Sequence, residues 1–127
     1  MIRRNTLLAG LTVALGLGAC GDGGADLARS AELLQQYYVD TPLGRSWRVE
    51  TIAASHKENT LRVNVQVTDE ADVQYLKALS SMDRLHAAKL ACPKPDDALR
   101  VALGSKTRIW VHLNSKTQEI ISSVCPK

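Results

Sequence analysis

The pattern of apolar and polar residues predicts strands in four parts of the chain. The clearest is 61–67, LRVNVQV, where every second residue is aliphatic and the residues between them are polar. Such alternation is typical of a strand with one buried face. The segment 47–55 shows a similar alternation that starts at Trp47. Near the end of the chain, 108–113 and 119–124 are two further apolar segments separated by NSKT, which predicts a hairpin.

Helical periodicity occupies the segments before and between these strands. Apolar residues recur at i, i+4, i+7 and i+11 from Leu27 to Tyr38, which places them on one helix face. Pro42 ends this helix, because proline cannot continue a helix interior. A second helical region starts after Thr68, its predicted cap, and contains another starting signal at Ser80.

The order helix, two strands, helix, two strands predicts an α+β fold. We expect an antiparallel sheet of about four strands with helices packed on one face, in the order α-β-β-α-β-β. This order resembles that of the BON domain, which occurs on periplasmic lipoproteins and can bind phospholipid. The resemblance lies in the element order, and the glycines that recur at that domain's strand ends are absent here.

The N-terminal segment has the layout of a secretory signal. Arg3 and Arg4 precede an uncharged apolar run at 7–19 that ends in small residues. As a helix this run would span about 20 Å, which is less than the ~30 Å hydrocarbon core of a bilayer. The run therefore predicts an export signal at 1–19 and no membrane-spanning helix.

The four residues Leu17-Gly18-Ala19-Cys20 resemble the lipobox of bacterial lipoproteins. The resemblance implies diacylglycerol on the Cys20 thiol, cleavage between Ala19 and Cys20, and acylation, as by palmitate, of the new amino group. The alternatives are an ordinary signal peptide with a chance cysteine, or a buried apolar helix.

The lipobox interpretation divides the chain into three parts. The parts are a signal peptide at 1–19, a lipidated cysteine with a flexible tether at 20–26, and one small domain at 27–127. The mature protein would be held to the membrane by the lipid on Cys20 and would face the periplasm. Gly21 is no strong retention signal, so the outer membrane is the default over the inner one.

Net charge gives no argument for a nucleic-acid partner. The whole chain carries a formal charge of +3, but Arg3 and Arg4 leave with the signal peptide. What remains is 14 Lys and Arg against 13 Asp and Glu, or +1. The mature domain therefore lacks the basic excess of a nucleic-acid-binding protein.

The cysteines predict a disulfide. Once Cys20 is assigned to lipid, Cys92 and Cys125 remain as a pair in an oxidising compartment. Two free buried thiols are one alternative, and a zinc pair is another. Neither cysteine has a second Cys or His at ligand spacing, however.

No motif in the chain indicates catalysis, a metal or another cofactor. The serine pairs Ser80-Ser81 and Ser122-Ser123 lack the glycine-flanked turn of a nucleophile elbow. His56, His86 and His112 lie on three different predicted elements, with no i, i+4 pair among them. We therefore expect no enzyme activity and no cofactor.

The hairpin contains the candidate partner-binding face. Alternation in the strand 108–113 turns Trp110 and His112 away from the side that faces the helices. A tight turn would place Trp110 opposite Ile121, His112 opposite Glu119, and Val111 opposite Ile120. The candidate face is therefore Trp110, His112 and Ile121. Either a second layer covers it as core, or it binds a partner.

These features predict a lipid-anchored interaction or scaffold module that binds an envelope protein. One alternative is a small envelope enzyme inhibitor, similar to the lysozyme-inhibitor lipoproteins, that projects the loop 93–106 into a cleft. Another is a binder of a lipid or small apolar ligand, which would need a cavity between the sheet and the helices.

Overall fold

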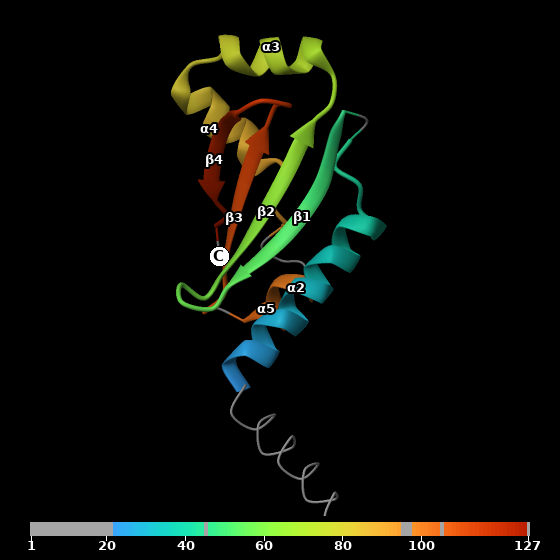
Figure 1. Cartoon of the computed structure of the whole chain (residues 1–127), viewed down its shortest axis with the longest axis vertical. Coiled ribbons are helices and arrows are strands. Elements are labelled where there is room, and N and C mark those ends of the chain that lie inside the picture. The colour runs from blue at the N-terminus through green and yellow to red at the C-terminus, as the bar shows by residue number, and fades with distance from the viewer. Residues whose placement is uncertain (1–21, 45, 95–97, 105, 127) are drawn as a thin grey trace, which may run out of the picture.

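The computed structural model of the chain describes residues 22–44, 46–94, 98–104 and 106–126, and Figure 1 shows their arrangement. A four-stranded sheet is combined with four described helices. The elements are α2 (Asp22–Asp40), β1 (Trp47–Ser55), β2 (Thr60–Val67), α3 (Glu70–Ala78), α4 (Ser81–Lys89), α5 (Ala98–Leu103), β3 (Arg108–Asn114) and β4 (Glu119–Val124). The predicted α+β class is confirmed.

The sheet is mixed, which corrects the prediction of an antiparallel sheet. Its strand order is β1-β2-β3-β4, and the pairs β1–β2 and β3–β4 are antiparallel while β2–β3 is parallel. Between β2 and β3 the chain forms three helices, whereas the predicted order contains one helix there. A long helical connection of this kind returns the chain to the starting end of β2, as parallel pairing requires.

Alternation along the central strands accounts for the core. The aliphatic residues of 61–67 and the residues Ile109, Val111 and Leu113 are at most 1% exposed. The predicted stripe of the first helix packs against them, with Leu27, Leu34 and Tyr38 buried.

The described helices place their buried side chains in this one core, on one face of the sheet. Figure 1 shows α4 behind β3 and β4, α2 beside β1, and α3 across the upper end of the sheet. The other face carries the intervening polar residues of β2, and no described helix lies across it in this view. We call it the open face.

Side-chain caps separate α3 from α4. Asp69 accepts a hydrogen bond from the Ala71 amide at 3.0 Å, so this residue caps α3 in place of the predicted Thr68. The Ser80 hydroxyl accepts from the Asp83 amide at 3.2 Å, as the starting signal at Ser80 predicted. Each cap satisfies an amide that the helix start leaves without a partner.

The predicted disulfide between Cys92 and Cys125 is present. The two Cα atoms lie 5.6 Å apart, within the usual range of about 4.4 to 6.8 Å. The bond joins the turn after α4 to the residue after β4, and the Cys125 amide also donates to the Ile109 carbonyl at 2.8 Å. Two ends of the fold that would otherwise fray are thereby held together.

Tyr38 links α2 to the region of the disulfide. Its hydroxyl donates to the Ala91 carbonyl at 2.6 Å, next to the disulfide. Burial raises the pKa of Tyr38 well above its ordinary value, with a smaller contribution from Tyr37. The neutral phenol is therefore the form that stabilises the fold.

We expect Tyr38→Phe to lower the free energy of unfolding by about 1 to 2 kcal/mol, because the buried Ala91 carbonyl loses its partner. The unfolded chain releases this proton near pH 10 and the folded chain does not. The free energy of unfolding of the wild type should therefore fall as the pH rises above about 10. The variant should lack the part of this pH dependence that comes from Tyr38. Urea unfolding at several pH values measures both effects. Tyr75→Phe, at a 64% exposed tyrosine, is the control and should change neither.

The predicted signal peptide at 1–19, Cys20 and residue 21 lie outside the described residues. In the part of the chain that the structure describes, no helix is both long and apolar enough to cross a membrane.

Candidate binding surfaces

The strand β3 places Trp110 and His112 on the open face, as its alternation predicted. Ile109, Val111 and Leu113 point into the core, so the residues between them point the other way. Parallel pairing then sets Arg62 of β2 beside Trp110. Trp110 is only partly buried, so a second layer does not enclose it.

Trp110 contacts both a cation and an imidazole. The guanidinium carbon of Arg62 lies 5.0 Å from the centroid of the indole ring, within the range of a cation–π contact. The His112 ring centroid lies 4.9 Å from that of Trp110, with the two planes inclined by 37°. Glu58, in the turn between β1 and β2, forms an ion pair of 3.4 Å with Arg62. The indole is therefore fixed by its neighbours within the open face.

His112 is held by a carboxylate and is nearly buried by its neighbours. Its Nδ1 lies 2.6 Å from Glu119 Oε1, and its side chain is 12% exposed. Its Nε2 is buried and makes no hydrogen bond to any described residue. A buried polar atom without a partner costs about 1 to 3 kcal/mol. Nε2 is therefore a buried polar atom beneath this face that no described residue satisfies.

The structure corrects the predicted pairing of the hairpin. Ile121 lies opposite Leu113, and it packs partly buried against the core. Trp110 instead lies opposite Val124, which is 44% exposed.

The loop between β3 and β4 causes this difference in pairing. Ser115 closes it with two hydrogen bonds to the Gln118 carbonyl, and a register shift follows between Leu113 and Asn114. His112 consequently lies opposite Ser122 and reaches Glu119 diagonally, while Val111 lies opposite Ser123 in place of Ile120. We call the set Arg62, Trp110, His112 and Val124 the tryptophan face.

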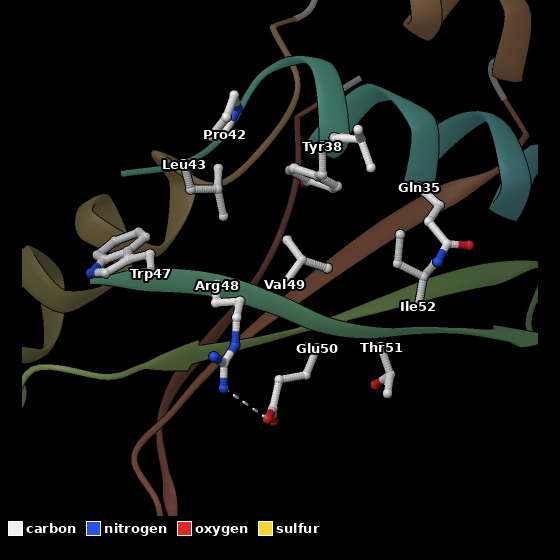
Figure 2. Close-up of a pocket in the computed structure, with 11 residues that line it drawn as sticks. Gln35, Tyr38, Pro42, Leu43, Trp47, Arg48, Val49, Glu50, Thr51 and Ile52 are labelled. Atoms are coloured by element: carbon white, nitrogen blue, oxygen red, sulfur yellow. Dashed lines mark ion pairs between the residues drawn. The ribbon is translucent and has the colours of Figure 1, made fainter. Parts of the chain in front are cut away.

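A second surface, which the sequence pattern does not predict, lies between α2 and the strand β1. It is a cleft of about 250 Å³ shown in Figure 2. Trp47, Val49 and Ile52 point from β1 into the space below α2, whereas Arg48 and Glu50 point away from it. Tyr38 and Leu43 close the cleft from the other side. The alternation of apolar and polar residues in 47–55 indicated an apolar side of β1. The distance between α2 and β1, which creates the cleft, cannot be predicted from a sequence.

A third surface lies on the far side of Trp47, against α3 and α4. This groove of about 520 Å³ is lined by Trp47, Tyr75, Leu76, Leu79 and Leu90, together with Asp72, Asp83, His86 and Ala87. Tyr75 and Leu90 are 64% and 77% exposed. The sequence offered one signal, because Tyr75 lies outside the buried stripe of Val73 and Leu76.

The remaining predicted features lie apart from these surfaces. The described part of the loop 93–106 contains α5, in which Arg100 and Leu103 are buried. Arg100 donates to the Pro126 carbonyl at 2.6 Å, so α5 is packed rather than projecting. Within the described ranges, no three His, Cys, Asp or Glu side chains come together as metal ligands.

Comparison with known proteins returned nothing: no protein family, no curated protein and no solved structure matches this chain.

Proposed function

We propose that this chain is a lipid-anchored protein of the cell envelope that acts as an interaction module, without catalytic activity. In this proposal Cys20 carries the lipid, the domain faces the periplasm beside the outer membrane, and the partner is an envelope protein. The tryptophan face is the surface that binds it. The lipobox resemblance supports the anchor, and the geometry of Trp110 supports the binding face.

The observation that carries the binding face is Trp110 itself. The side chain lies on the open face, where a tryptophan left partly in water forgoes about 1 to 2 kcal/mol of burial. Trp and Arg are the residue types that most often dominate binding energy at protein interfaces, and here they are stacked. They project from the two central strands, so a partner would pay little to order them.

Trp110→Ala should spare the fold and weaken partner binding. The substitution removes a partly buried ring and one cation–π contact, so we expect it to lower the free energy of unfolding by less than about 2 kcal/mol. Loss of a central tryptophan should weaken the partner complex on the order of 30-fold. Affinity purification of the tagged chain from solubilised envelopes measures the second effect.

The control is Tyr75→Ala, which removes another exposed aromatic ring on a different surface. It should leave partner recovery unchanged. Unfolding of the Trp110→Ala variant, or equal recovery by it and the wild type, would refute the binding role of this face.

The groove beside α3 and α4 supports a second candidate function, the binding of a small apolar ligand. Its volume of about 520 Å³ lies in the range of ligand sites, and aromatic and aliphatic side chains form much of its lining. An apolar fluorescent probe such as phenylnaphthylamine should then bind, and Leu90→Asp should abolish the fluorescence. The control is Val101→Asp on α5, because Val101 is 78% exposed and Leu90 is 77% exposed. This control should leave the fluorescence unchanged. Equal probe binding by both variants would remove this candidate.

A further inference from the structure

The strand β1 is an edge strand whose core side is incompletely covered. It has β2 on one side and no described strand on the other. Trp47, Val49 and Ile52 are partly buried, in contrast to the aliphatic residues of β2, which are at most 1% exposed. The cleft of about 250 Å³ lies along these three residues (Figure 2). An added strand beside β1 would pair its free edge and cover apolar surface at once.

The opposite side of β1 carries two opposite charges. Arg48 and Glu50 form an ion pair of 3.9 Å, and their side chains are 69% and 46% exposed. Both point away from the cleft (Figure 2). The pairing of β1 with β2 shifts register between Val49 and Thr51, so Glu50 is the extra residue of a bulge. A bulge sets two residues of one strand against one residue of its neighbour.

These features make β1 complementary to itself. If a second copy runs antiparallel with Val49 opposite Val49, Arg48 of each copy lies opposite Glu50 and Thr51 of the other. The bulge then brings Trp47 of each copy opposite Ile52 of the other, on the apolar side. Opposite charges meet on one side of the junction and apolar side chains on the other. Such self-complementarity is what a two-fold symmetric interface requires.

We propose that β1 pairs with β1 of a second copy of this chain, so that two four-stranded sheets join into one continuous sheet. Bulges and charges usually protect an edge strand from pairing. Here the charges of Arg48 and Glu50 are complementary between the two copies, and the bulge aligns Trp47 with Ile52 of the other copy, so the same features favour one specific partner. Because the two-fold axis is perpendicular to the joined sheet, both open faces lie on the same side. The dimer therefore presents two tryptophan faces in one direction, which permits bivalent binding.

Crosslinking of the full chain in its membrane tests the pairing. Val49→Cys places a thiol at the two-fold axis, and a short bismaleimide should join two copies. Ala53→Cys lies on the same strand but far from its own counterpart in this register, and it should give no dimer. The unsubstituted chain is the control for the other cysteines, of which Cys92 and Cys125 are disulfide-bonded. A monomaleimide confirms that the thiol at position 49 reacts.

Charge reversal then tests the register. Adding Arg48→Glu or Glu50→Arg to Val49→Cys should reduce the dimer yield roughly tenfold, because each reversal places like charges opposite one another twice. Adding both reversals together should restore the yield. Lys57→Glu, an equal change of charge in the exposed turn after β1, should have no effect. A reactive thiol without dimer, an equal yield from Ala53→Cys, an unaffected single reversal, or a double reversal without rescue would each overturn the proposal.

Discussion

Replacing Cys92 and Cys125 together with serine is expected to lower the free energy of unfolding by about 3 to 4 kcal/mol. The bond closes a loop between residues separated by 33 positions, and its main effect is to restrict the unfolded chain. Small domains are stable by only about 5 to 15 kcal/mol, so this loss is a large share of the total. Urea unfolding measures it, and the melting temperature should fall by roughly 10 to 25 °C.

Two controls separate the bond from the local effect of the substitution. Reducing the wild type should produce a similar loss, because the cysteines remain and only the bond is removed. Ser122→Ala, on the strand that precedes Cys125, should change stability little. A loss below about 1 kcal/mol in both the double variant and the reduced wild type would show that the disulfide is not a principal stabilising element.

Cys20→Ser is expected to abolish the lipid anchor altogether. In the proposed lipoprotein, the thiol of Cys20 is the only position that accepts diacylglycerol, and serine has no thiol. An anchor of several acyl chains holds a protein firmly, since each buried methylene contributes about 0.8 kcal/mol. The variant should therefore keep its uncleaved signal or lose its lipid. Mass spectrometry of the N-terminus and detergent-phase partitioning measure both outcomes.

Gly21→Ser is the control for this experiment, because it introduces the same side chain at the adjacent position and keeps the thiol. It should remain lipidated. If the Cys20→Ser variant were still trimmed after Ala19 and still partitioned with detergent, the lipobox interpretation would be wrong.

Local pattern was enough to predict the strands of this fold. The predicted segments 47–55 and 119–124 coincide with β1 and β4, and 61–67 and 108–113 each fall one residue short of β2 and β3. Alternation is a property of neighbouring residues, and the core side of each strand can be read from it. The parallel pairing of β2 with β3 could not be predicted in this way, because it depends on where three intervening helices return the chain.

The candidate face was predictable to the same extent. Trp110 and His112 were assigned to the correct side of β3 from alternation alone. Ile121 was placed wrongly because a register shift near the loop changes which residues lie opposite one another. Arg62 was missed because its position beside Trp110 follows from the parallel pairing. The two clefts beside Trp47 depend on the spacing of helices and strands, which no local pattern records.

The most direct test of the tryptophan face is site-specific photo-crosslinking in intact cells. A photoreactive residue at Val124, which is 44% exposed and opposite Trp110, samples this face, and the same residue at the exposed Val101 of α5 samples a remote surface. We predict a discrete adduct of constant mass from position 124, no such adduct from position 101, and loss of the first when Trp110→Ala is added. Equal adducts from both positions, or an adduct at 124 that persists without Trp110, would contradict the account.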